Sequence, residues 1–152
     1  MENIKHIQSI AIITSAETLQ GNIEDAYRFY DCFSTTKKDL IIYTTHPISD
    51  YTSIKKVSAS ELTVLYSKDF LPLNIGLKPN VRSILKSKEY QVLVHFDFSP
   101  KCYKNSLLIA KAISAQIKIT SYNNKVFNVV LKNHSSAAEY LSAVLKYLNK
   151  LL

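Results

Sequence analysis

The sequence predicts a single α/β domain of three layers, in which a mainly parallel, twisted β-sheet carries helices on both faces. Apolar segments rich in β-branched residues alternate along the chain with segments of helical periodicity, an order that favours a parallel sheet. The apolar run Val92–Val94 is continuous instead of alternating, as expected of a strand covered on both faces. The length of 152 residues suits one domain, 1–152, with one core of ordinary size.

The first strand and the first helix are predicted from residues 9–33. The segment SIAIIT, 9–14, is a short β-branched run bounded by polar residues, which is typical of a buried strand. Asn22 then supplies a helix cap, and two acids follow in the first turn, where the helix dipole favours them. Apolar residues at helical spacing continue this helix to about Phe33. Two further apolar segments are expected strands: 39–45 and 62–67.

The middle of the chain is expected to contain a loop, a short helix and the central strand. Residues 71–80 hold two of the four prolines and one of the two glycines, which indicates a loop. Asn80 is placed to cap a short helix that carries Val81, Ile84 and Leu85 toward the core. The segment YQVLVHFDF, 90–98, is predicted to be the strand at the centre of the sheet.

The last third is expected to contain a helix, two strands and a closing helix. The helix starts either at Ser99-Pro100, as cap and first-turn proline, or nearer Asn105. Two strands flank Asn123-Asn124, and because Asn tolerates positive φ they are expected to form an edge hairpin near residues 116–132. The closing helix has one apolar stripe: Leu141, Val144, Leu145, Leu148 and Leu152. This order of elements is Rossmann-like.

Composition predicts a cytoplasmic protein without a membrane span. The longest apolar runs are far shorter than the roughly 18 residues that a spanning helix needs. The run IAIITSA, 10–16, is short and is interrupted by Thr14 and Ser15, which favours a buried strand over a signal peptide. The two cysteines, Cys32 and Cys102, form neither a disulfide framework nor a metal cluster.

Charge is unevenly distributed along the chain. Residues 1–70 hold nine acids and seven basic residues, net −2, whereas residues 71–152 hold three acids and twelve basic residues, net +9. A basic half is suited to nucleic acid or to an anionic surface. However, Arg28 and Arg82 are the only arginines, and the abundance of Lys, Asn, Ile and Tyr indicates codon bias. Electrostatic binding to RNA or ribosomes is therefore the least favoured hypothesis.

Several reaction classes are excluded by the scarcity of glycine and by the spacing of the histidines. Gly21 and Gly76 are the only glycines, so a dinucleotide-binding loop, a Walker loop and a GxSxG nucleophile elbow are all excluded. The four histidines are far apart in sequence and show no metal-ligand spacing. The sequence therefore assigns no cofactor, no metal and no catalytic residue.

A candidate ligand site is expected beyond the carboxyl ends of the strands, where Rossmann-like sheets bind their ligands. His95 and Asp97 are two apart on a strand and share a face, so they are placed to form an acid–base pair. The alternative, which we favour, is a core histidine and a turn-capping aspartate. His46 ends the second strand in the same region. Ser99 and Lys101 suggest an anion site at a helix start, although helix capping alone explains them.

Two further groups of residues have a functional and a structural interpretation. Four helical tyrosines are candidate interface residues, because tyrosine can bury its ring while its hydroxyl stays in water. They are Tyr27, Tyr30, Tyr140 and Tyr147, and the alternative is that they line an ordinary core. Cys102 is either a nucleophile near a helix start or, as we favour, a small buried thiol.

Several segments resemble an uncharacterised bacterial family, a domain of unknown function found in Bacteroidota. The resemblance covers YQVLVHFDFS with NSLLIAKAISAQIKI, the SKDF segment at 67–70 and the closing AEYLSAVLKYLNKL. The chain departs from the family pattern at Gln91, where Asp is usual, and near Ser121, where Gly is usual. The resemblance implies a Rossmann-like fold and a cytoplasmic bacterial setting, and it implies no activity. A weaker likeness exists to the amino-terminal domain of heptosyltransferase-type glycosyltransferases.

These observations lead to one expectation and two alternatives. The leading expectation is a non-enzymatic module that binds another protein or itself through amphipathic tyrosines. The first alternative is a small-ligand or enzymatic site at the carboxyl ends of the strands, built from His46, His95, Asp97 and Ser99. This alternative requires a concave pocket that His95 or Asp97 contacts. The second alternative is electrostatic binding of RNA by the basic half.

Overall fold

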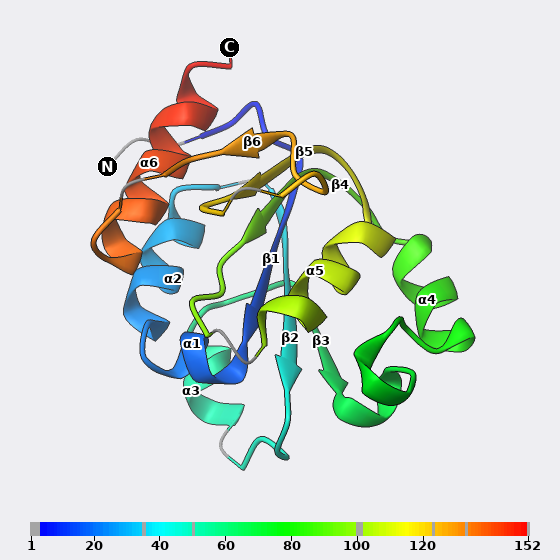
Figure 1. Cartoon of the computed structure of the whole chain (residues 1–152). Coiled ribbons are helices and arrows are strands. Elements are labelled where there is room, and N and C mark those ends of the chain that lie inside the picture. The colour runs from blue at the N-terminus through cyan, green and yellow to red at the C-terminus, as the bar shows by residue number, and fades with distance from the viewer. Residues whose placement is uncertain are drawn as a thin grey trace.

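The computed structural model describes residues 4–34, 36–49, 51–99, 102–122, 124–132 and 134–151. These residues form a six-stranded, fully parallel sheet in the order β3-β2-β1-β4-β5-β6, with helices on both faces (Figure 1). The strands are β1 Ser9–Ser15, β2 Lys37–Thr44, β3 Glu61–Tyr66, β4 Glu89–His95, β5 Ser114–Thr120 and β6 Val129–Val130. The α-helices are α1 Ala16–Gln20, α2 Ile23–Asp31, α3 Tyr51–Lys55, α4 Pro79–Lys86, α5 Tyr103–Ala112 and α6 Ala137–Asn149. The predicted Rossmann-like, three-layer architecture is therefore confirmed.

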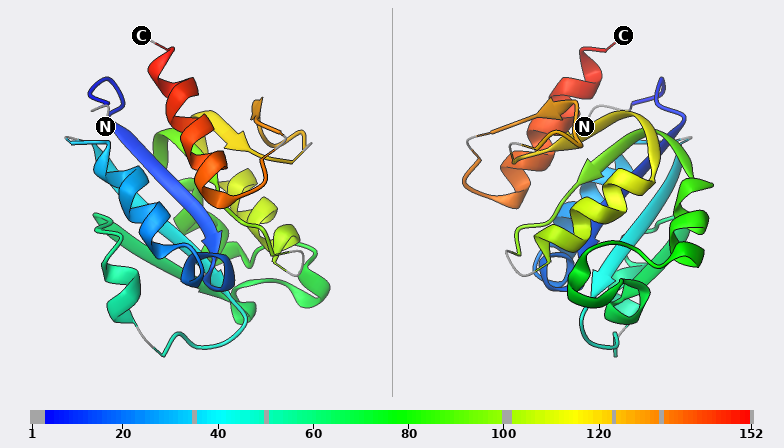
Figure 2. Two further views of the ribbon diagram at one scale, coloured as in Figure 1. Left: turned by 90° about the vertical axis from the view of Figure 1, so that its left-hand side faces the viewer. Right: turned by 45° about the vertical axis from the view of Figure 1, so that its right-hand side comes forward.

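Two apolar cores lie on opposite faces of the sheet. Alternate residues of β1 face opposite ways, so Ile10 and Ile12 enter one core and Ala11 and Ile13 enter the other. The first core is closed by α1, α2, α3 and α6, and the second by α4 and α5. Figure 2 shows these two sets of helices from different sides, with α2 and α6 in the left view and α4 and α5 in the right view.

The central position of the 90–98 segment is confirmed. β4 pairs with β1 on one side and with β5 on the other, and Val92, Leu93 and Val94 are completely buried. The strand order reverses between β1 and β4, because the chain builds outward from β1 in one direction and then outward from β4 in the other. This reversal is where ligands of open parallel sheets usually bind.

The predicted edge hairpin is wrong, because β6 pairs with β5 in the parallel sense. Asn123 lies outside the described residues, and the carbonyl of Asn124 accepts from the Phe127 amide at 3.3 Å. Phe127 is buried in the second core, so the chain crosses that face before it enters β6. Asn128 extends the edge with its side-chain amide, which accepts from the Lys118 N–H at 2.8 Å and donates to the Gln116 carbonyl at 2.9 Å.

Several helix boundaries differ from the predicted ones. α1 follows β1 directly and is capped by the Ser15 hydroxyl, which accepts from the Thr18 amide. α4 begins at Pro79, not after Asn80, and its Ile84 is 57% exposed instead of facing the core. α5 begins at Tyr103, two residues before the later predicted start, whereas Pro100 lies outside the described residues.

The closing helix is confirmed with one addition. Leu141, Val144 and Leu148 are buried as predicted, and Tyr140 joins them in the core. Leu152, which the stripe included, lies outside the described residues. Within the described ranges, no helix combines the length and the apolar character that crossing a bilayer would require.

Candidate functional site

Asp97 is buried just beyond β4 and joins the elements around the strand ends. Its Oδ1 accepts from the Ser15 hydroxyl at 2.9 Å, the Thr18 hydroxyl at 3.0 Å and the Ser99 amide at 3.0 Å. Its Oδ2 accepts from the Ser106 hydroxyl of α5. With only 1% of Asp97 exposed, these hydrogen bonds replace water as partners of the carboxylate. Asp97 therefore positions β1, α1 and α5 and does not face a ligand.

His95 is also sealed in the core, and its contacts differ from those of Asp97. Its Nδ1 lies 2.9 Å from the Thr120 hydroxyl, while its Nε2 has no hydrogen-bond partner among the described residues. The ring packs against Tyr103, Tyr122 and Phe127. Burial lowers the pKa of His95 to about 4, against the opposing effect of the nearby Asp97 charge, so the imidazole is neutral at neutral pH. The favoured interpretation, a core histidine and a turn-capping aspartate, therefore agrees with the structure, and the two sealed side chains do not make the pocket contact that the alternative requires.

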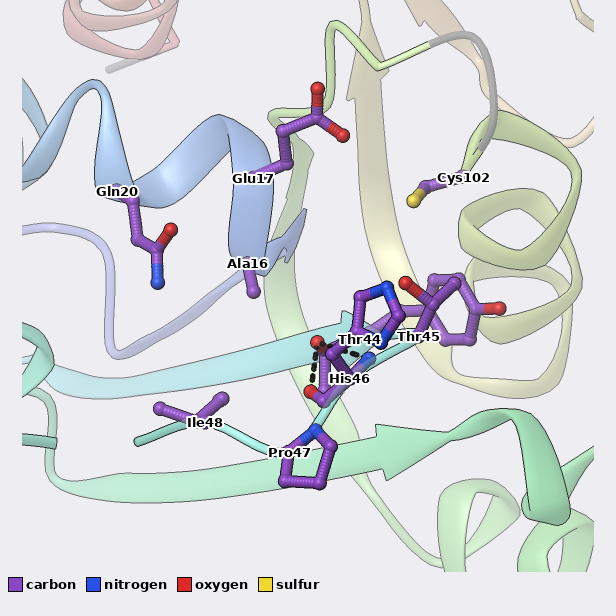
Figure 3. A pocket seen from close by; sticks show the side chains of 10 residues that line it. Ala16, Glu17, Gln20, Thr44, Thr45, His46, Pro47, Ile48 and Cys102 are labelled. Atoms are coloured by element: carbon purple, nitrogen blue, oxygen red, sulfur yellow. Dashed lines mark hydrogen bonds between the residues drawn. The ribbon is translucent and has the colours of Figure 1, made fainter. Parts of the chain in front are cut away.

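A small pocket does lie at the predicted edge of the sheet, beyond the carboxyl ends of β1 and β2 (Figure 3). Its volume is about 260 Å³. α1, the loop after β2 and the start of α5 supply its polar lining: Glu17, Gln20, Thr44, Thr45, His46 and Cys102. The Thr44 hydroxyl donates to the His46 carbonyl at 2.6 Å, which holds the loop in a tight turn. Common ligand pockets are somewhat larger, at roughly 300–1,000 Å³.

The structure brings together only part of the predicted ligand site. His46 lines the pocket, and Ser99 borders it through a hydrogen bond from its hydroxyl to Glu17 Oε2 at 3.1 Å. Lys101 lies outside the described residues. Glu17 was missed because α1 has five residues and is too short to show helical periodicity, although Ser15 carries a capping signal.

The Cys102 side chain has the properties of a buried thiol. It lies at the N-cap of α5, and burial raises the pKa of the thiol despite hydrogen bonds from Ser99 and Ser15 that act in the opposite direction. A raised pKa lowers the thiolate fraction at neutral pH, and the thiolate is the nucleophilic form. The geometry therefore favours the structural interpretation of Cys102.

A second hollow, here called the α4–α5 groove, lies on the opposite side of the sheet from α2. It has a volume of about 350 Å³, and its lining includes Ile75, Leu77, Arg82, Lys86, Leu108 and Lys111. Three of these side chains are basic, and none of the described residues that line the groove is acidic. The sequences of α4 and α5 likewise contain no Asp or Glu. The groove is therefore both apolar and electropositive.

The loop at one end of this groove exposes apolar side chains. Leu73 is 89% exposed and Ile75 is 70% exposed, which are the two highest values among the large apolar side chains described as exposed. Leu73 and Asn74 have φ angles of 60° and 52°, in the left-handed region that residues other than glycine seldom adopt. This segment was predicted only as a loop, because backbone conformation cannot be inferred from its composition.

The four predicted interface tyrosines divide into two pairs. Tyr30 and Tyr140 are fully buried, so neither is available to a partner, and this part of the prediction is wrong. The Tyr30 hydroxyl accepts from the Ile12 amide of β1 at 2.9 Å and donates to the Asp39 carbonyl of β2. The Tyr140 hydroxyl donates to the His95 carbonyl at 2.8 Å. Tyr27 and Tyr147 are partly exposed.

Comparisons with known proteins give one structural likeness. No protein-family model and no curated protein matches the chain. Among solved structures, the chain is similar to the C-terminal domain of the PF1911 hydrogenase from Pyrococcus furiosus, with 13% identity and a TM-score of 0.44. The match covers 78% of this chain and 93% of that domain. The likeness carries no functional argument, and the resemblance to the Bacteroidota family stays a prediction.

Proposed function

We propose that this domain is a non-enzymatic module that binds another protein through the α4–α5 groove. The observation that carries the proposal is the exposure of Leu73 and Ile75 on a loop whose backbone is strained. Exposed apolar side chains that gather beside a hollow mark interaction sites in soluble proteins. The tyrosines that motivated the expectation of protein binding support it less than this loop does, because two of the four are buried.

The strain in the loop supports a binding role because the surrounding contacts maintain it. Phe70 and Leu77 form an antiparallel bridge at the base of the loop, and the Leu71 amide donates to the Gly76 carbonyl at 2.8 Å. At the tip, the Asn74 side-chain oxygen accepts from the Asn105 amide of α5 at 3.1 Å. A left-handed residue other than glycine costs about 1 kcal/mol, and such strain concentrates at ligand-binding segments.

The charges around the groove determine which partner fits it. The hollow is lined by three basic side chains, Arg82, Lys86 and Lys111. Carboxylates on a partner would form ion pairs with their charged groups. Leu73 and Ile75 would be matched by an apolar anchor at the centre of the contact. The partner surface is therefore an aromatic or aliphatic side chain flanked by Asp or Glu.

The proposal is tested by NMR titration of the ¹⁵N-labelled chain with a synthetic amphipathic peptide of leucines and glutamates. We expect chemical-shift changes at α4, α5 and the 70–77 loop. The variant Ile75→Ser should weaken binding by at least about tenfold, because anchor residues each contribute more than 1.4 kcal/mol. The variant Arg82→Glu should weaken it comparably and should remove most of the salt dependence.

Two controls and two adverse outcomes complete the experiment. Lys132→Glu makes the same charge change at an exposed position after β6, at the far edge of the sheet, and should leave binding unchanged. A peptide with lysines in place of the glutamates should not bind. Shifts spread over the whole surface would overturn the proposal. Tighter binding of a short oligouridine RNA to the same groove would replace it with the RNA alternative.

A further inference from the structure

The helices on the two sheet faces carry opposite charge. The two helices that follow β1, α1 and α2, hold four acids and one arginine, net −3: Glu17, Glu24, Asp25, Asp31 and Arg28. The helices of the other face, α4 and α5, hold four basic residues and no acid, net +4: Arg82, Lys86, Lys104 and Lys111. The two views of Figure 2 show that these helix pairs lie on opposite sides of the sheet.

The outer face of α2 carries the chemistry that the α4–α5 groove would recognise. Tyr27 is 39% exposed, and Glu24 and Asp31 lie three residues before it and four after it, on the same side of the helix. We call these three residues the α2 surface. Asp31 is the last residue of α2, where the helix dipole disfavours a negative charge. The stability of the helix alone therefore does not explain why an acidic residue stands at the end of α2.

We propose that the partner of the α4–α5 groove is a second copy of this chain, which presents its α2 surface. This inference rests on the proposed function and names the partner of the same groove. Tyr27 would lie against Leu73 and Ile75. Asp31 would face the basic heads that line the groove, together with Glu24, which in the single copy is paired with Arg28 at 3.3 Å. An aromatic anchor surrounded by charged residues is a common arrangement at protein interfaces.

The two surfaces lie on opposite faces of one molecule, so the contact is heterologous. A pair of copies joined in this way leaves one groove and one α2 surface free, and association therefore continues past the dimer. Exposed ion pairs contribute little and are screened by salt, so assembly should weaken as ionic strength rises. These features distinguish the contact from a symmetric dimer, which stops at two copies.

The test is sedimentation equilibrium of the full chain and of two variants. The groove variant carries Arg82→Glu and Lys86→Glu, and the α2 variant carries Tyr27→Ser and Asp31→Lys. We expect the mass of the wild type to rise with concentration beyond that of a dimer. Each variant alone should remain monomeric, because it lacks one of the two surfaces. An equimolar mixture should form a 1:1 heterodimer, because the groove of the α2 variant accepts the α2 surface of the groove variant.

The other outcomes separate this inference from the proposed function. A monomeric wild type that still binds the acidic peptide in its groove would overturn self-association and leave the proposed function standing. A monomeric wild type that does not bind the peptide would overturn both. Association that persists in either variant, or a mixture that stays monomeric, would place the contact elsewhere and overturn the inference. Lys132→Glu is the matched control and should assemble as the wild type does.

Discussion

At the scale of single residues, Asp97 is the side chain on which the strand ends most depend. Replacing it with Ala should lower the free energy of unfolding by about 3 kcal/mol, because three buried hydroxyls and one amide lose their acceptor. Asp97→Asn should cost about 1 kcal/mol, since its oxygen keeps the Oδ1 bonds and the Ser106 hydroxyl can reorient. Urea unfolding at neutral pH measures both. Equal losses in the two variants would show that negative charge, not hydrogen bonding, is what the site requires.

His95 makes stability depend on pH. The unfolded chain takes up a proton near the ordinary histidine pKa of about 6.5, whereas in the folded state the pKa is about 4. Because the folded pKa is the lower one, this contribution to stability is complete above pH ~6.5 and falls as the pH drops toward 4. The loss should total about 3 kcal/mol.

His95→Phe isolates this effect, because phenylalanine keeps an aromatic ring in the cluster and does not titrate. We expect the difference in unfolding free energy between the wild type and this variant to change by about 3 kcal/mol between pH 7 and pH 4. Acidic groups that lie far from His95 titrate equally in both proteins and cancel in the difference. A difference that is flat across this range would mean that His95 titrates in the folded state as it does in the unfolded chain, as an exposed imidazole would.

At the scale of elements, the left-handed backbone of the 70–77 loop should lower the stability of the fold and favour binding of the acidic peptide. Leu73→Gly removes a left-handed leucine and should raise the free energy of unfolding by about 1 kcal/mol, while it weakens binding of the acidic peptide. Thermal unfolding and the NMR titration measure the two effects. Ser58→Gly is the matched control, since its φ is 62° but it lies outside the groove. That control should gain stability and keep its affinity.

The edge strand β6 depends on one side-chain amide. Asn128→Ala should remove the hydrogen-exchange protection of the Lys118 amide and lower stability by about 1 kcal/mol. Asn128→Asp keeps an acceptor for Lys118 and loses only the donor to Gln116, so it should preserve that protection. Protection of Lys118 that survives in the alanine variant would mean that the β5 edge does not need Asn128.

Sequence signals predicted the elements that are long or fully apolar. Val92–Val94 identified the central strand because only a doubly covered strand needs three successive apolar residues. α1 and α3 were not predicted, since five residues are too few to show helical periodicity. The hairpin error arose because Asn124 signals a local turn, whereas the direction of β6 depends on Phe127 entering the second core.

At the scale of the whole molecule, the topology places the acidic and the basic helices, which are separate along the sequence, on opposite faces of the sheet. The acidic helices follow β1 and the basic helices follow β3 and β4, so the reversal of strand order sends them to opposite faces. The sequence therefore predicted the charge imbalance but not its segregation. The α4–α5 groove was not predicted for the same reason, because it joins two helices and a loop that meet only in the folded sheet.

Tyr30 has a consequence for the order of assembly during folding. Its hydroxyl connects the Ile12 amide and the Asp39 carbonyl, so β1 and β2 complete their polar pairing only when α2 has docked. These three elements should therefore form one kinetic nucleus, whose contacts exist already at the rate-limiting barrier. Tyr30→Phe should slow refolding in stopped-flow experiments and leave the unfolding rate nearly unchanged. A variant that mainly unfolds faster would instead place this contact after the barrier.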